Sequence, residues 1–314
     1  MKLGLDIGGT NSVFGVVDEN GSVIADGTLK TTAYKTPEEF VADAKVLVDK
    51  LAEEVGGKDK ITGFGISAPN SNPYTGEIWP APNVVWARHR KVPFVKMMQE
   101  ATGIPCAITN DANAAALGEK MFGVAKNFKD FIMITLGTGL GTGVVVNHEL
   151  VYGKNGMAGE LGHTYRVEAA NRTCACGRKG CLETIASATG VANTARIMLA
   201  QSREPSLLRE IPAKNITSYD VSMAAEKGDK LAIEVYEFTG TVLGRACADF
   251  ATVISPEAFV FFGGMSKAGE LLLRPVRKAF DEHAFHLFKG QVEMLQSTVE
   301  GQFAAVIGAS TIAP

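Results

Sequence analysis

A tight cluster of cysteines is the strongest chemical signal in this 314-residue chain. Three of the five cysteines fall within residues 174–181. They are Cys174, Cys176 and Cys181. Thiolates this close can converge on one Zn²⁺ ion, which takes four ligands in a tetrahedron at a structural site. His163 is the nearest candidate for the fourth ligand, because Cys106 and Cys247 lie far off in the sequence. The spacing predicts a structural zinc site, and reduced thiols or a disulfide would be the alternative.

Three glycine-rich turns that follow apolar segments have the chemistry to bind a nucleotide. They are Asp6-Ile7-Gly8-Gly9-Thr10-Asn11, Gly137-Thr138-Gly139 and Gly263-Gly264. Glycine lets backbone N–H groups point at phosphate oxygens, and Asp6 can hold Mg²⁺ or its water shell. The third turn would let a flat ring lie against the backbone. Each turn alone is equally an ordinary tight turn, but the set favours a nucleotide. The chain has neither a Walker A loop nor a Rossmann fingerprint.

Asn110-Asp111 falls at an expected strand end and helix start. A carboxylate there can accept the proton of a hydroxyl group while Asn110 orients that hydroxyl. A plain helix cap is the alternative.

Further side chains could recognise a polyol. Glu160, His163 and Glu183 supply acceptors for several hydroxyls, or are surface groups near a structural zinc. An expected loop over residues 70–92 carries three more that could cover a sugar face or fill a domain seam: Trp79, Asn83 and Trp86.

Composition excludes several classes of protein. The chain is 46% hydrophobic with a net charge of -3, so it has no basic field to attract nucleic acid or an anionic membrane. Asp6 comes too early for a signal peptide, and no apolar run reaches the ~18 residues of a membrane span. The odd, clustered cysteines favour a reducing compartment. We expect a cytoplasmic protein.

The elements that position these residues repeat along the chain. Strands at 2–7 and 12–17 flank the first glycine turn, and strands at 131–136 and 142–146 flank the second. This repetition predicts two α/β domains of similar build. We place residues 1–112 plus 300–314 in a small N-terminal domain and 113–299 in a larger one that carries the cysteines. Helices are expected to begin at Thr36-Pro37, to run from 229 to 254 and to run from 275 to 283.

In this order, the motifs resemble those of the ROK family of sugar kinases and repressors, across essentially the whole chain. The motifs are Asp6-Ile-Gly-Gly-Thr10, Asn110-Asp111-x-Asn113, Leu136-Gly-Thr-Gly139, Gly159-Glu-Leu-Gly-His163 and Cys174-x-Cys-Gly-x-x-Gly-Cys181-x-Glu183. The Glu-x-Gly-His and cysteine pair is highly specific to that family. The first turn is shared with all actin-like ATPases.

The resemblance implies two actin-like (ribonuclease H-like) ATPase domains with a nucleotide and sugar cleft between them. It implies Asp111 as general base and an ATP-dependent hexose kinase, with glucokinase as the predicted activity. The implied hexose contacts are Asn83, Asn110, Asp111, Glu160, His163 and Glu183. The implied contacts to ATP and its Mg²⁺ are Asp6, Gly8, Gly9, Thr10, Asn11, Gly137, Thr138, Gly139, Gly263 and Gly264. The implied Zn²⁺ ligands are His163, Cys174, Cys176 and Cys181.

One departure and several alternatives accompany this resemblance. The family often has Pro-Gly where this chain has Pro69-Asn70, which puts sugar preference at that corner of the pocket in question. Repressor members carry an N-terminal winged helix-turn-helix, whereas a strand is expected here from Lys2. Alternatives are a fructokinase, a kinase of N-acetylmannosamine or N-acetylglucosamine, and a sugar-sensing regulator without catalysis. The resemblance also implies a homodimer.

Overall fold

The computed structural model describes residues 1–299 and 303–314. The chain divides into two compact units. Unit 1 contains Met1–Asn127, Glu149–Gly159 and Thr298–Pro314, and unit 2 contains Phe128–His148 and Glu160–Ser297. Residues 300–302, which the sequence analysis assigned to the small domain, lie outside the described residues.

This division differs from the expected boundary at residue 112. Residues 113–127 belong to unit 1 because helix α3 (Asp111–Phe122) packs against helix α8 (Ala304–Thr311). Residues 149–159 belong there too, since Tyr74 Oη donates to the Gly153 carbonyl at 2.9 Å and Asn72 Nδ2 donates to the Asn155 carbonyl at 3.0 Å.

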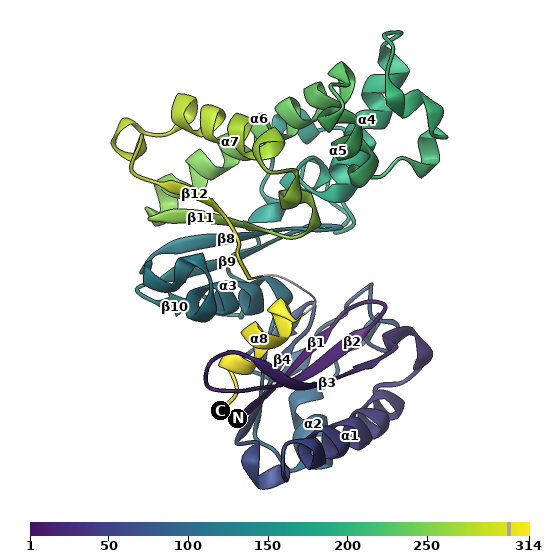
Figure 1. Ribbon diagram of the computed structural model, residues 1–314, viewed down its shortest axis with the longest axis vertical. Helices are drawn as coiled ribbons and strands as arrows, with labels where there is room; N and C mark the ends of the chain where they lie inside the picture. Colours follow the sequence, from purple (N-terminus) through teal and green to yellow (C-terminus); the bar gives the residue numbers. More distant parts are fainter. Residues whose placement is uncertain (300–302) are drawn as a thin grey trace. The chain divides into compact units, whose positions relative to one another are not determined.

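Unit 1 is built on a five-stranded sheet, of which Figure 1 labels the first four strands along the chain. The strand order is β3-β2-β1-β4-β7. The strands are β1 (Lys2–Ile7), β2 (Ser12–Val17), β3 (Val23–Leu29), β4 (Gly63–Ser67) and β7 (Cys106–Thr109). β1 runs parallel to β4, with Asp6 opposite Ser67, and β4 runs parallel to β7, with Ser67 opposite Thr109. The carboxyl ends of these three strands therefore meet at one edge.

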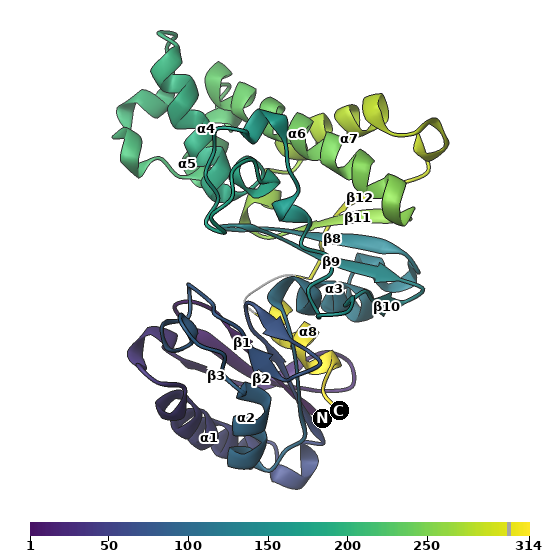
Figure 2. The ribbon, with the colours of Figure 1, turned by 180° about the vertical axis from the view of Figure 1, so that it is seen from behind.

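Helices cover both faces of this sheet (Figure 2). Helix α1 (Pro37–Glu54) and helix α2 (Phe94–Thr102) lie on one face, and α8 lies on the other. The predicted start of α1 is confirmed, because Thr36 and Glu39 form a capping box. The short strands β5 (Ser71–Asn72) and β6 (Glu77–Ile78) pair with each other. The short strand β10 (Glu149–Leu150) is an edge strand of the other five-stranded sheet, whose order is β10-β9-β8-β11-β12.

A strip of three glycines lets α8 approach the sheet closely. Gly4 pairs with Gly15 on β2 and with Gly65 on β4, and we call these three residues the glycine strip. A Cβ atom on Gly65 would lie 1.7 Å from the Ala309 carbonyl oxygen, and one on Gly4 would lie 2.1 Å from that of Val306. The sheet and α8 are thus in backbone contact.

Unit 2 repeats the strand–turn–strand opening, as predicted. β8 (Phe131–Leu136) is antiparallel to β9 (Leu140–Val146) and parallel to β11 (Ala258–Phe262), which is parallel to β12 (Glu293–Gln296). The helices of the unit are α4 (Ala188–Gln201), α5 (Ser218–Glu226), α6 (Lys230–Ile254) and α7 (Glu270–His283). Helix α6 begins after Asp229, whose side chain accepts from the Ala232 amide, so the predicted span is confirmed.

The predicted start of helix α7 at Pro275 was wrong. The helix begins at Glu270, and its first bonds run from the amides of Leu272 and Leu273 to the Gly269 carbonyl. Pro275 lies inside the helix and faces Gly240 of α6, where a Cβ atom would come within 2.5 Å of the proline ring. Packing against a glycine, rather than starting a helix, explains this proline.

Candidate functional site

Unit 1 gathers two carboxylates and a hydroxyl at the carboxyl ends of its parallel strands. Ser67 Oγ donates to Asp6 Oδ1 at 2.8 Å, across neighbouring strands. Asp111 follows β7, and its negative charge raises the pKa of Asp6. Asn110 caps helix α3, since its Oδ1 accepts from the Asn113 amide at 2.7 Å, so the cap reading of Asn110 is confirmed.

The surrounding protein raises the pKa of both carboxyl groups. Desolvation raises the pKa of Asp6 to about 6, the charge of Asp111 adds to this, and the Ser67 hydroxyl opposes it. Desolvation by the surrounding protein also raises the pKa of Asp111, against the Ala112 amide, which donates to Oδ1 at 2.8 Å. The Asp111 side chain is nevertheless exposed to solvent. An accessible carboxylate with a raised pKa suits a general base.

The first glycine turn and the residue Asn83 lie against each other in unit 1. The turn is closed by the Gly8 amide, which donates to the Asn11 carbonyl at 3.0 Å. A Cβ atom on Gly9 would lie 3.0 Å from the Asn83 carbonyl oxygen. Thr10 and Asn11 are exposed. The structure therefore brings the predicted phosphate turn and the predicted sugar contact together.

Trp86 does not cover a sugar. It is 2% exposed and stacks between Phe40, at 5.3 Å between ring centroids, and Phe94, at 5.5 Å. Trp79 is half-buried, donates to Glu77 at 3.1 Å and lies under the Lys91 ammonium group. Of the three loop residues, Trp86 belongs to the core of unit 1.

Asn70, at the position where the family often has glycine, adopts a glycine-like conformation. Its φ angle is 52°, in the left-handed region that asparagine tolerates better than most residues. Its side-chain Nδ2 donates to the Pro80 carbonyl at 2.7 Å, and its carbonyl accepts from the Trp79 amide at 3.0 Å. These two hydrogen bonds of Asn70 stabilise the start of the loop that carries Asn83.

In unit 2 the four predicted metal ligands come together. The ligand atoms of His163, Cys174, Cys176 and Cys181 all lie within 4.8 Å of one another. His163 Nδ1 is 3.8 Å from Cys174 Sγ, and Cys176 Sγ is 3.7 Å from Cys181 Sγ. A zinc tetrahedron with bonds of about 2.3 Å has edges of about 3.8 Å, so the donor set fits Zn²⁺. All five cysteines are free thiols, so the disulfide alternative was wrong.

Of the three predicted hydroxyl acceptors, His163 belongs to this cluster, and Glu160 and Glu183 contact its members. His163 Nε2 faces Glu160 Oε2 at 3.9 Å, while its Nδ1 faces Cys174. Glu183 Oε2 accepts from the Leu140 amide at 3.0 Å, and Glu183 Oε1 accepts from Cys174 Sγ at 3.3 Å. One imidazole can thus bind metal at one nitrogen and meet a substrate at the other.

The two glycine turns of unit 2, at residues 137–139 and 263–264, also lie close together. The Gly137 carbonyl accepts from the Ala188 amide at the start of α4, at 2.8 Å, and Thr189 Oγ1 donates to the Thr138 carbonyl at 2.8 Å. Gly263 has a φ angle of 101°, and a Cβ atom there would lie 2.6 Å from the Leu136 carbonyl oxygen. Two glycine turns therefore follow neighbouring parallel strands, as phosphate and base binding require.

Sequence reasoning missed Ser67 and Thr189. Ser67 ends strand β4, and only the order of the strands places it opposite Asp6. Thr189 lies in the first turn of α4, and nothing near it in the sequence points to the Gly137–Gly139 turn.

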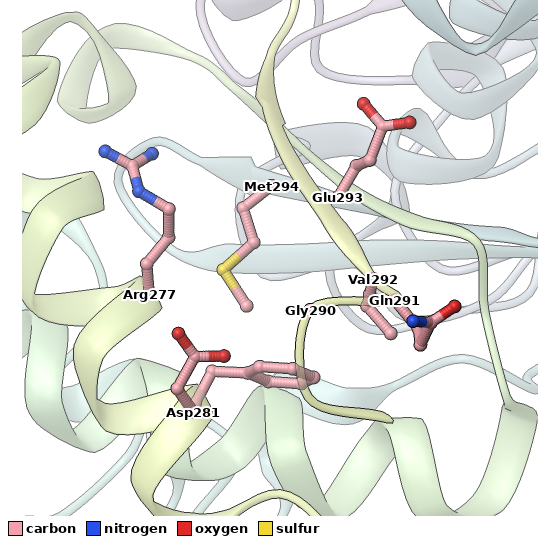
Figure 3. A pocket seen from close by; sticks show the side chains of 8 residues that line it. Arg277, Asp281, Gly290, Gln291, Val292, Glu293 and Met294 are labelled. Atoms are coloured by element: carbon pink, nitrogen blue, oxygen red, sulfur yellow. The ribbon is translucent and has the colours of Figure 1, made fainter. Parts of the chain in front are cut away.

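A cavity of about 380 Å³ between helix α7 and strand β12 is not a comparable site (Figure 3). Met294 points toward α7, whereas Glu293, its neighbour on the strand, points away. Arg277 at the rim is paired with Glu270.

Among the described residues, no helix combines the length and apolar character that crossing a membrane requires.

A sequence profile of the ROK family matches residues 2–314. The chain belongs to the ROK family. A glucokinase of Halalkalibacterium halodurans is 35% identical to this ROK family protein over 309 residues, covering 98% of this chain and 92% of that one. A glucokinase of Thermotoga maritima is 31% identical over 316 residues, covering 99% and 96%.

The crystal structure of a ROK family glucokinase from Streptomyces griseus, in complex with glucose and AMPPNP, superposes with a TM-score of 0.80. It is 33% identical and covers 99% of this ROK family protein and 98% of its own chain. The predicted α/β class and actin-like ATPase fold are confirmed by this likeness.

Proposed function

We propose that this ROK family protein is an ATP-dependent hexose kinase that converts glucose to glucose 6-phosphate. The observation that carries the proposal is the group of Asp6, Ser67 and Asp111 at the ends of three parallel strands. A regulator that only senses sugar has no need of an accessible carboxylate with a raised pKa beside a phosphate turn. The glucokinases at 31–35% identity support glucose as the substrate.

The reaction needs positioning and charge neutralisation more than covalent chemistry. The 6-hydroxyl oxygen of glucose attacks the γ-phosphorus of ATP, its proton passes to Asp111, and the bond to the β-phosphate oxygen breaks to release ADP. Asn110, Asn83, Glu160, His163 and Glu183 would bind the other hydroxyls. Mg²⁺ bound with ATP neutralises phosphate charge, and Asp6 would hold it or its water.

The three glycine turns would bind ATP. Amides of the turns at 8–11 and 137–139 would face the phosphates, and Gly263-Gly264 would lie against the base. Zn²⁺ would be held by His163 and the three clustered cysteines, whose spacing fits a tetrahedron. It would fix the segments that carry Glu160 and Glu183, with no part in the chemistry.

A panel of sugars tests the proposal. ADP release should be measured with glucose, fructose, N-acetylmannosamine and N-acetylglucosamine, and zinc should be measured on the same preparation. We expect the highest kcat/KM with glucose and one zinc per chain. A preference for another sugar would select an alternative kinase, and sugar binding without ADP release would select the regulator.

Loss of one thiolate should remove zinc and sugar affinity together. In Cys176→Ser, a hydroxyl replaces a thiolate ligand, so we expect sub-stoichiometric zinc and at least about tenfold weaker glucose binding. Metal analysis and calorimetry on one sample measure both. The control is Cys106→Ser, since Cys106 lies outside the cluster and its Ile104 partner can accept from a hydroxyl too. Full glucose affinity in zinc-free protein would show that the ion does not hold the sugar pocket.

Activity should fall in acid with a limb near pH 6. The pKa of Asp6 is raised to about 6, so its charged form predominates only above that pH and is lost as the pH falls through it. Ser67→Ala removes the hydroxyl that stabilises the charge and should move the limb of kcat/KM up by as much as about one pH unit. The control is Ser71→Ala, because the Ser71 hydroxyl is equally buried but makes no hydrogen bond among the described residues. If the acidic limb of kcat/KM stayed at the same pH in Ser67→Ala, the titration of Asp6 would not be the cause of that limb.

We further propose that the protein works in the cytoplasm as a homodimer without nucleic acid. The free thiols of a zinc-type cluster support a reducing compartment. Sedimentation of the zinc-loaded protein measures the oligomeric state, and a monomer at working concentration would remove the dimer from the proposal.

A further inference from the structure

Glu183 is attached to the turn that is proposed to bind phosphate. Its Oε2 accepts from the Leu140 amide at 3.0 Å, directly after Gly137-Thr138-Gly139. A Cβ atom on Gly139 would lie 2.4 Å from the same oxygen. Gly139 does not have a left-handed φ angle, so backbone conformation does not demand glycine there. A Cβ atom there would instead displace the Glu183 carboxylate, which is the end of a flexible side chain.

We propose that Gly139 is a positioning residue for the sugar, although it lies in the phosphate turn. By lacking a side chain, it lets Glu183 reach the Leu140 amide, and this bond sets the direction of the carboxylate that binds sugar hydroxyls. The inference rests on the proposed function and deepens it. The Glu183 carboxylate would then connect the sugar site of unit 2 to its phosphate-binding turn.

The remaining contacts of Glu183 leave it free to bind a hydroxyl group. A carboxylate offers about four acceptor sites, and the Leu140 amide occupies one of them. Cys174 donates to the other oxygen at 3.3 Å and occupies a second site. About two acceptor sites therefore remain for sugar hydroxyls.

The same turn supplies a matched pair of variants. Gly137 and Gly139 both lie outside the left-handed region, but a Cβ atom on Gly137 would meet nothing within 4 Å. Glucose affinity is measured by calorimetry without nucleotide, so effects on ATP do not enter. We expect Gly139→Ala to weaken glucose binding at least about tenfold, as expected for losing a hydrogen bond to a charged group. Gly137→Ala should bind glucose like the wild type, whatever its KM for ATP.

A double-mutant cycle distinguishes displacement of Glu183 from general damage. Glu183→Asp shortens the side chain by one methylene and withdraws it from a new methyl group at 139. On that background, Gly139→Ala should add less than about a twofold further loss of glucose affinity. Thermal unfolding of each variant identifies any misfolded protein.

The outcomes separate this inference from the proposed function. Wild-type glucose affinity in Gly139→Ala, an equal loss in Gly137→Ala, or additive losses in the cycle would each overturn the positioning role while glucose kinase activity stands. Failure of the wild type to bind any hexose would instead overturn the proposed function and this inference with it.

Discussion

Asp111→Asn should lower kcat by about 10³-fold, within the range attributed to general bases. Asparagine cannot take the proton of the attacking hydroxyl. Its side-chain oxygen can still accept from the Ala112 amide, which donates to Asp111 Oδ1 at 2.8 Å, so the start of helix α3 should be kept. Glucose should therefore still bind, and calorimetry beside a coupled ADP assay measures both quantities.

The control is Asp281→Asn, which makes the same change of charge at the α7–β12 cavity. It should leave kcat and glucose affinity unchanged. If Asp111→Asn kept kcat within a few-fold of the wild type, Asp111 would not be the base, and proton removal would have to be assigned to another group.

Gly65→Ala should be the most damaging small substitution in unit 1. Its Cβ atom would lie 1.7 Å from the Ala309 carbonyl oxygen, a backbone atom that cannot move aside without displacing α8. We expect a loss of more than about 3 kcal/mol in the free energy of unfolding and a fall in Tm of about 10 °C. Calorimetry or circular dichroism on purified protein measures this.

Gly264→Ala is the matched control for stability. A Cβ atom there would meet nothing within 4 Å, and its φ angle is not in the left-handed region. This variant should unfold within about 2 °C of the wild type, because removing a glycine where space allows is near neutral or stabilising. A Gly65→Ala protein as stable as the wild type would mean that α8 is not held against the glycine strip.

Local patterns predicted the parts of the site that lie close together in the sequence. The cysteines at 174–181 and His163 are near neighbours along the chain, and the structure brings their ligand atoms together. The spans of β1, β2 and β8 are as predicted, because each is a short apolar run next to a turn. Spacing along the chain is informative when the loop that must close is short.

Other features depend on which elements become neighbours. Trp86 reads as a loop aromatic until Phe40 and Phe94 are found on either side of it. Pro275 reads as a helix start until Gly240 of α6 faces its ring. The hydrogen bond from Ser67 to Asp6 joins residues on different strands. The local sequence of neither strand predicts the order β1-β4-β7 that makes them neighbours. Tertiary packing overrides local signals at these positions.

The glycine strip also sets an order of events during protein synthesis. Strands β1 and β4 leave the ribosome early, yet the helix that covers their bare backbone is encoded at residues 304–311. Until those residues emerge, one face of the first sheet is without its cover while unit 2 is already being made. Unit 1 should therefore finish folding after unit 2, and nascent chains stalled before residue 304 should be bound by chaperones.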